Sequence, residues 1–211
     1  FEADILFKYR FMVDNKIYGM QWIEADCRPE QKTIKSKVMT YRADAIKPAD
    51  DIENAELRYM AFDIECIPSD TKKPIDAKHD PIVIVSFSFV PEFRGKKTLV
   101  LVAKPCSGEG IRGFSTEKEM LEEFLNIIDL YDPDVLTGYN INSFDLPYIA
   151  ERLKQNKLPL TLGRCDKEIF SRTYGMTQEF TITGRIVADP YQILKRDPWV
   201  KLHRYDLNSV A

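Results

Sequence analysis

The sequence predicts a mixed α/β fold in which helices cover a sheet, preceded by a small β-rich segment. Three strand-like segments, 59–66, 82–90 and 98–102, are followed by a helical pattern, a short strand and a second helical pattern. Three strands followed by helix, strand and helix indicate one mixed sheet covered by helices. With 211 residues, 44% of them hydrophobic, the chain is long enough to bury a real core.

The first part of the chain is expected to form the β-rich segment. Residues 47–57, with Pro48 and several acidic side chains, lack apolar periodicity and are predicted to be a linker. The linker separates residues 1–46 from a larger domain over 58–211. Before it, polar turn residues alternate with short apolar runs, which predict strands at 5–7, 17–23 and 38–41.

The larger domain has recognisable helix boundaries. Thr116 and Glu119, three residues apart, form a capping box, and Asp132-Pro133 ends the helix that starts there. The apolar side chains of this helix fall on one face: Met120, Phe124, Ile127 and Ile128. A short strand is expected over 135–139 and a second helix over 146–157. Asp189 is expected to cap a short helix at Pro190.

Charge and cysteine content narrow the classes of function. The formal net charge is -3, so a nucleic-acid partner would be held by a local site rather than by a field over the whole surface. The four cysteines lie far apart, which argues against a zinc site or a disulfide framework and favours a reducing, intracellular setting. No apolar run approaches the roughly 20 residues that span a bilayer, so no membrane partner is expected.

Two carboxylates in the first strand of the larger domain are candidates for a metal site. Asp63 and Glu65 are two residues apart, so the period of a strand puts both on the same face. Asp-x-Glu also occurs at 51–53 and 166–168, but in polar stretches where a solvated surface explains it. Two anions side by side in an apolar strand need a raised pKa or a bound cation, and all-oxygen ligation favours Mg²⁺ or Mn²⁺.

A second group of polar residues leaves the strand at 135–139 and enters the helix that follows. Asp145 lies at or near the helix start, where it could be an N-cap or a third carboxylate directed at Asp63 and Glu65. Asn140 could be a turn residue or a polar ligand for a sugar or base. Phe144 could belong to the core or stack on a base. The residues alone leave these alternatives open.

These two stretches resemble motifs of a known family. Residues 62–66 (Phe-Asp-Ile-Glu-Cys) are similar to the first, and residues 138–148 to the second, of three motifs of the 3′→5′ proofreading exonuclease domain in family B DNA polymerases. Residues 1–14 resemble the preceding segment in archaeal and eukaryotic replicative members, which would make 1–46 the end of the polymerase N-terminal domain. Shorter matches in the family's order extend the resemblance over nearly the whole chain: 80–82, 132–135, 184–186 and 205–210.

The resemblance implies a fold and a metal site. The fold would be ribonuclease-H-like, with a mixed sheet of about five strands flanked by helices. The site would hold two divalent ions, Mg²⁺ or Mn²⁺, with Asp63 and Glu65 as direct ligands. Asp145 would hold the second ion directly or through water.

The resemblance also implies a substrate. Asn140 and Phe144 would contact the single-stranded 3′ end of a DNA primer, and the backbone around Ile64, Glu65 and Cys66 would support its terminal nucleotide. The reaction would remove mismatched 3′-terminal nucleotides during replication by a DNA-directed DNA polymerase. Other partners would be the remainder of the polymerase chain and a sliding clamp, in the cytoplasm of an archaeon or the nucleus of a eukaryote. Basic residues that could contact phosphates, or simply face solvent, are Arg152, Lys154, Arg185, Lys195, Arg196, Lys201 and Arg204.

The third motif of the family, Tyr-x-x-x-Asp, is missing. The only such spacing, Tyr59 to Asp63, already belongs to the first strand. Since the family has this motif after the stretch that resembles 205–210, we expect a longer chain beyond Ala211 and little activity from the 211 residues alone. The alternatives are a stand-alone 3′→5′ exonuclease of the same fold and a non-catalytic, DNA-binding domain. The residues upstream of the linker disfavour the first, and the presence of both Asp63 and Glu65 disfavours the second.

Overall fold

The computed structural model describes residues 5–30, 36–50, 53–174 and 177–210. The chain divides into two compact units, Phe1–Glu56 and Leu57–Ala211. Each unit is described by itself. Assignment of the first as the end of a polymerase N-terminal domain remains a prediction.

The described residues of the first unit form the helix α1 (Phe7–Asp14) and the antiparallel strands β1 (Ile23–Pro29) and β2 (Tyr41–Pro48). The strand predicted at 5–7 is wrong, because Phe7 begins a helix in which its ring lies 6.4 Å from that of Phe11, one turn later. The other two strands begin later than predicted. The pairing between the two strands sets their bounds. Because Pro48 of β2 lies opposite Ile23 of β1, Lys47 and Pro48, which were predicted to belong to the linker, are part of the sheet.

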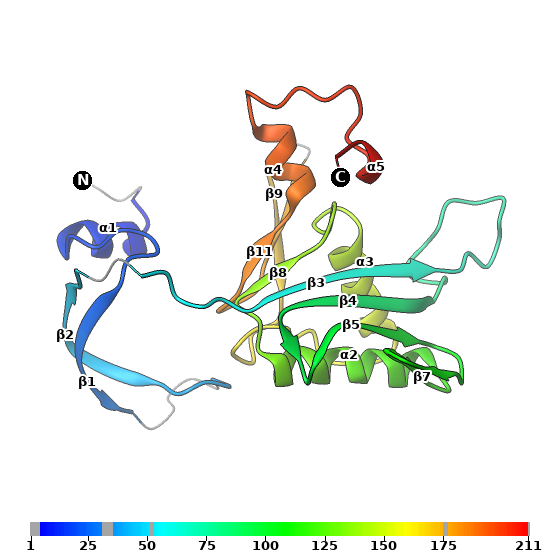
Figure 1. Ribbon diagram of the computed structural model, residues 1–211, viewed down its shortest axis with the longest axis horizontal. Helices are drawn as coiled ribbons and strands as arrows, with labels where there is room; N and C mark the ends of the chain where they lie inside the picture. Colours follow the sequence, from blue (N-terminus) through cyan, green and yellow to red (C-terminus); the bar gives the residue numbers. More distant parts are fainter. Residues whose placement is uncertain (1–4, 31–35, 51–52, 175–176, 211) are drawn as a thin grey trace. The chain divides into compact units, whose positions relative to one another are not determined.

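The second unit contains the mixed sheet that the sequence predicts, shown in Figure 1. Its seven strands lie in the order β11-β8-β3-β4-β5-β7-β6. β3 is parallel to β8 on one side and antiparallel to β4 on the other. The strand bounds are β3 (Tyr59–Cys66), β4 (Ile82–Phe93), β5 (Lys96–Val102), β6 (Ser107–Gly108), β7 (Ile111–Gly113), β8 (Val135–Thr137) and β11 (Ile186–Ala188). The count exceeds the expected five because of very short strands with weak sequence signals, such as β6 and β7.

The main helices begin where the sequence predicts. The hydroxyl of Thr116 accepts a hydrogen bond from the Glu119 amide at 3.2 Å and caps α2. Asp132, in the left-handed region at φ 50°, ends this helix before Pro133. Asp189 caps α4 as expected, accepting from the Tyr191 amide. The helix bounds are α2 (Glu117–Tyr131), α3 (Asp145–Gln155), α4 (Pro190–Arg196) and α5 (Leu207–Val210).

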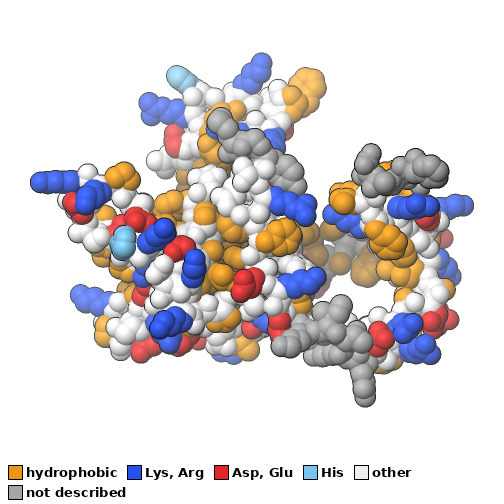
Figure 2. All heavy atoms as spheres, turned by 180° about the vertical axis from the view of Figure 1, so that it is seen from behind, with side chains coloured by type: hydrophobic (Ala, Val, Ile, Leu, Met, Phe, Trp, Pro, Cys, Tyr) orange, Lys and Arg blue, Asp and Glu red, His pale blue; other side chains and the backbone are white. Residues whose placement is uncertain are grey.

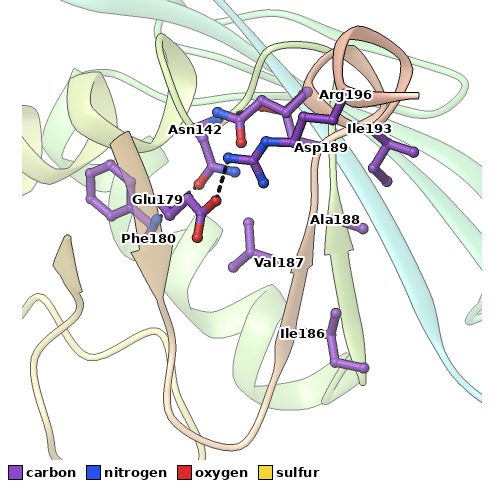
Figure 3. A pocket seen from close by; sticks show the side chains of 10 residues that line it. Asn142, Glu179, Phe180, Ile186, Val187, Ala188, Asp189, Ile193 and Arg196 are labelled. Carbon is purple, nitrogen blue, oxygen red and sulfur yellow. Dashed lines mark hydrogen bonds and ion pairs between the residues drawn. The ribbon is translucent and has the colours of Figure 1, made fainter. Parts of the chain in front are cut away.

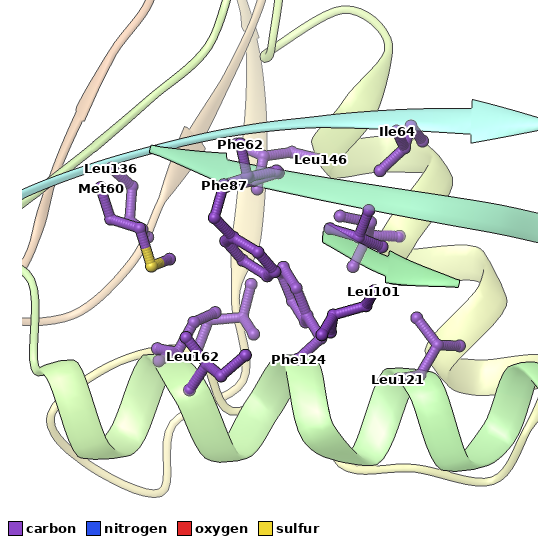
Figure 4. Close-up of a cluster of buried hydrophobic side chains, with 14 of the residues drawn as sticks. Met60, Phe62, Ile64, Phe87, Leu101, Leu121, Phe124, Leu136, Leu146 and Leu162 are labelled. Atoms are coloured by element: carbon purple, nitrogen blue, oxygen red, sulfur yellow. The ribbon is translucent and has the colours of Figure 1, made fainter. Parts of the chain in front are cut away.

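The core fills the space between the sheet and α2, as Figure 4 shows. Phe124 of α2 is fully buried, and its ring lies 5.5 Å from Phe62 of β3 and 5.8 Å from Phe87 of β4. Leu146 and other apolar residues of α3 join the same cluster. Because side chains alternate along a strand, β3 directs Phe62 and its neighbours Met60 and Ile64 into this core and leaves its polar residues on the opposite face.

An antiparallel hairpin, β9 (Phe170–Tyr174) and β10 (Thr177–Thr181), has no counterpart in the sequence predictions. Its polar composition gives little periodic signal, and its strands pair with each other. Within the residues that the structure describes, no helix is long and apolar enough to cross a membrane.

Candidate active site

The first two candidate carboxylates lie side by side on the open face of β3. Asp63 and Glu65 are exposed, whereas Ile64, which lies between them in the sequence, and Phe62, which precedes Asp63, are buried. Partial burial, and then the neighbouring charge of Glu65, raise the pKa of Asp63 above its ordinary value. The predicted same-face arrangement of the two side chains is therefore present, and it concentrates negative charge there.

The third candidate, Asp145, lies against this strand. It is the first residue of α3 and only 2% exposed. The interpretation of Asp145 as the N-cap is wrong, because Phe144 occupies that position. The Asp145 carboxylate instead accepts a hydrogen bond from the Ile64 amide at 3.2 Å. This bond joins the residue between the two acids of β3 to the helix start, 81 positions later.

Burial, and then the negative charge of Asp63, raise the pKa of Asp145 to about 7. The bond from Ile64 opposes this shift without cancelling it. Among the described residues, Asp63, Glu65 and Asp145 form no ion pair with a Lys or Arg side chain. A buried carboxylate beside a second one, with no cation to balance them, is a costly arrangement for the folded chain.

Replacing Asp145 with asparagine should therefore stabilise the metal-free chain. The folded pKa of Asp145 lies above the unfolded value, so its contribution to stability is present below about pH 4 and is lost as the pH rises towards 7. The Asp145→Asn chain has no such loss. Its melting temperature should exceed that of the parent by about 5 °C at pH 8 and match it near pH 4. An equal difference at both pH values would contradict this assignment.

The backbone before Asp145 passes unusually close to β3. A Cβ atom added to Gly138 would lie 2.6 Å from the carbonyl oxygen of Phe62, so only glycine fits this approach. Asn140 has a positive φ of 62°, and its backbone N–H donates a hydrogen bond to the Asp189 carboxylate at 3.0 Å. The loop 138–144 is thus pressed against the strand that carries the first two acids.

The remaining predicted site residues occupy different environments. Phe144 is 39% exposed and its ring lies 5.6 Å from that of Tyr148, so it is partly available to a ligand. Ile64 is buried and its amide is already bonded to Asp145, which leaves no free N–H for a nucleotide. Cys66 is half-buried, and burial raises the pKa of its thiol to about 11.

The carboxylates of Asp63, Glu65 and Asp145 suit a hard divalent cation. Their side chains do not all converge on one point in this structure. Within the described ranges, no three His, Cys, Asp or Glu side chains converge closely enough to hold a metal ion. The negative charge of Asp63 contributes to the raised pKa of Asp145, and that of Glu65 contributes to the raised pKa of Asp63. Clustered carboxylate oxygens are the donors that Mg²⁺ and Mn²⁺ prefer, and such a cation neutralises their negative charge.

Two of the candidate phosphate-binding residues are unavailable. Arg152 is paired with Glu117, and Arg185 with Asp132, both in largely buried positions. Arg196 remains 58% exposed in its pair with Glu179. On the face in Figure 2, basic side chains are interspersed with acidic ones. These observations fit a local site better than a broad basic surface.

A cavity of about 370 Å³ adjoins the loop 138–144 at Asn142. Figure 3 shows the ion pair of Glu179 and Arg196 beside it, with an N–O distance of 2.6 Å. Its other lining residues are Phe180, Ile186, Val187, Ala188, Asp189, Gln192 and Ile193. The three candidate acids lie outside this cavity, so it is distinct from the acidic face of β3.

The sequence assigns no role to two residues that the fold brings to the site. Asn142 is 5% exposed, and its side-chain oxygen accepts from the Phe180 amide of β10 at 2.9 Å. Tyr148 donates its hydroxyl to the carbonyl oxygen of Asp80 at 2.9 Å, which ties α3 to the segment after β3. Their partners lie 38 and 68 residues away, so no local spacing could have revealed them.

A mixed sheet whose β3 strand presents two acids, with a third acid held against it by a helix start, has the features of a nuclease domain. The sequence model of the family described as DNA polymerase family B, exonuclease domain, matches residues 1–210. The chain therefore belongs to the exonuclease domain family of family B DNA polymerases. The resemblance inferred from the two motifs is confirmed, and exonuclease domains of this family are generally metal-dependent nucleases.

Individual relatives agree with the family match. The chain is 34% identical over 241 residues to the DNA polymerase delta catalytic subunit of Oryza sativa subsp. japonica, and 36% identical over 244 residues to that of Plasmodium falciparum (isolate K1 / Thailand). These alignments cover 100% of this chain and 21% and 22% of the relatives. The chain thus spans about a fifth of their length.

A solved structure also matches the fold. It is the family B DNA polymerase from the hyperthermophilic archaeon Pyrobaculum calidifontis, with a TM-score of 0.72 and 27% sequence identity. The match covers 94% of this chain and 23% of that one. The predicted fold class, a mixed sheet flanked by helices, is confirmed.

Proposed function

We propose that this chain is the 3′→5′ proofreading exonuclease portion of a DNA-directed DNA polymerase and removes mismatched nucleotides from primer 3′ ends during replication. The observation that carries the proposal is the hydrogen bond from the Ile64 amide to the Asp145 carboxylate, at 3.2 Å. It holds the acid of the helix start against the strand with Asp63 and Glu65. Family membership supplies the reaction class to which such a cluster is suited.

Asp63, Glu65 and Asp145 would hold two divalent ions, Mg²⁺ or Mn²⁺. When bound, such ions supply an activated water and stabilise the departing 3′ oxygen. Bound cations would offset the burial and the neighbouring negative charge that raise the pKa values of Asp63 and Asp145, and would so keep these two carboxylates ionised. The product is a deoxynucleoside monophosphate.

The substrate is the single-stranded 3′ end of a primer. Phe144, which is partly exposed beside the acidic face, would stack on a base, and Asn140 would hydrogen-bond to a sugar or base. Cys66 and the carbonyl side of Ile64 would support the terminal nucleotide. Stacking is tolerant of base identity, so selection comes from fraying, which occurs more readily at a mismatch. The partners are DNA, the remainder of the polymerase and a sliding clamp, in the compartment where the genome is replicated.

The test uses the complete polymerase that contains these residues and a 5′-labelled single-stranded oligonucleotide. With Mg²⁺ or Mn²⁺, we expect a ladder of products shortened from the 3′ end, and with EDTA in excess, none. A matched oligonucleotide with a phosphorothioate at its last 3′ linkage should be shortened much more slowly. Release of the 5′ label as a mononucleotide, or no metal-dependent shortening, would contradict the proposal. Shortening by a protein without a polymerase region would instead favour the stand-alone exonuclease.

A further inference from the structure

We propose that Asp189 is a positioning residue for the candidate active site, and that its buried carboxylate holds the loop 138–144 in the conformation that presents Asn140, Phe144 and Asp145. The inference rests on the proposed exonuclease function. Asp189 touches backbone amides rather than the substrate, so its part in the reaction is indirect.

Asp189 is anchored on its own side of the fold. It follows β11 directly, is the N-cap of α4 and is 3% exposed. Its Oδ1 accepts from the Tyr191 amide at 3.1 Å, the bond that an N-cap residue ordinarily makes. One end of the contact is therefore fixed to the helix.

The same carboxylate makes two further hydrogen bonds, which capping does not require. Its Oδ1 accepts a hydrogen bond from the backbone N–H of Asn140 at 3.0 Å, and its Oδ2 accepts one from the backbone N–H of Asn142 at 3.1 Å. These donors lie 49 and 47 residues earlier in the sequence. Amides that converge in a loop form a concavity suited to an anion, and here the anion is a side chain of the same domain. Figure 3 shows Asp189 and Asn142 on neighbouring segments.

The loop needs such a partner because of its backbone conformation. Asn140 lies in the left-handed region, at φ 62°, which costs a non-glycine residue free energy and persists where the surroundings hold it. Without the carboxylate, the two amides would lose their acceptor in a site from which water is largely excluded. The loop would then relax towards an ordinary conformation.

A change at Asn140 would reach the candidate acids through short backbone contacts. The carbonyl oxygen of Asn140 accepts from the amides of Ser143 and Phe144 at 3.0 and 3.1 Å. Phe144 is the N-cap of α3, and Asp145 is its first residue. Asp189 therefore controls where the helix starts relative to the strand that carries Asp63.

The test separates positioning from capping. Serine caps helices about as well as aspartate does, but its shorter side chain cannot reach the loop amides. In the complete polymerase, Asp189→Ser should lower kcat for shortening single-stranded DNA by about 10- to 100-fold, as expected for a small misplacement of reacting groups. DNA synthesis by the same protein should be unchanged.

The matched control is Thr116→Ala, which removes the cap of α2, a helix that carries none of the candidate site residues. It should lower the melting temperature by a few degrees and leave kcat unchanged. Parent-like kcat for Asp189→Ser would overturn the positioning role. If that variant does not fold, Asp189→Asn replaces it, because it keeps the shape but turns one acceptor into a donor that faces an amide. A fall in kcat for Asp189→Asn supports the proposal, and parent-like kcat overturns it.

The two proposals fail in different ways. If Asp63→Ala leaves exonuclease activity intact, the proposed function is lost and the role of Asp189 is lost with it. If Asp63→Ala abolishes activity but Asp189→Ser and Asp189→Asn are fully active, only the positioning inference is overturned.

Discussion

Asp63→Ala is expected to abolish 3′→5′ exonuclease activity in the complete polymerase, lowering kcat by at least about 10³-fold. Asp63 shares the open face of β3 with Glu65, and its charge acts on Asp145. Its loss would remove the one acid that interacts with both others, so the remaining two could not hold cations in place. The measurement is single-turnover shortening of 5′-labelled single-stranded DNA with Mg²⁺, and separately with Mn²⁺.

Asp166→Ala is the matched control, because Asp166 also belongs to an Asp-x-Glu sequence but is an exposed residue outside β3. It should leave the rate unchanged, and DNA synthesis should be unchanged in both variants. Undiminished shortening by Asp63→Ala would refute the assignment of this acidic cluster, whatever the family of the chain.

Among the proposed substitutions, Glu117→Ala should lower stability most, by about 3–5 kcal/mol in the free energy of unfolding. The Glu117 carboxylate accepts from the Ile82 amide at 2.8 Å, from Asn156 at 3.0 Å and from Arg152, whose side chain is 10% exposed. Burial alone would raise the pKa of Glu117, but these hydrogen bonds, with that of Arg152 the strongest, lower it. Without Glu117, the Arg152 guanidinium would stay buried and unpaired, which is the source of the cost.

Urea denaturation of this chain measures the effect, and Glu122→Ala in the same helix is the control. Glu122 faces Lys118 at 3.9 Å with both side chains about half exposed, so its loss should change the unfolding free energy by less than about 0.5 kcal/mol. Equal effects of the two variants would show that the Glu117 pair contributes no more than a surface pair.

The sequence predicted the parts of the fold that rest on local signals. β3 consists of a largely apolar stretch with alternating burial, and the capping box at Thr116 marks the start of α2. The bounds of β3 and the start of α2 were therefore predicted at the correct residues. The helix α1 and the hairpin β9–β10 were missed. A short apolar run or a polar segment has no periodicity that distinguishes a helix from a strand. Contacts with segments elsewhere in the chain determine which of the two it forms.

The candidate acids could be chosen from the sequence because their signals are also local. A strand of period two puts Asp63 and Glu65 on one face, and the change from strand to helix puts Asp145 at a helix start. What spacing could not distinguish was a capping role for Asp145 from a role at the site. The bond from Ile64 to Asp145 made that distinction.

The family, the mixed sheet and the candidate acids of the first two motifs could be inferred from the sequence alone, because each depends on signals in neighbouring residues. Three features emerged only from the folded arrangement: the contact of Asp145 with β3, the internal ion pairs of Arg152 and Arg185, and the hydrogen bond from Asn140 to Asp189. Each of these contacts joins residues about 30 to 80 positions apart. Such contacts form only when packing of the core brings the segments together, because loop closure must first be compensated by burial.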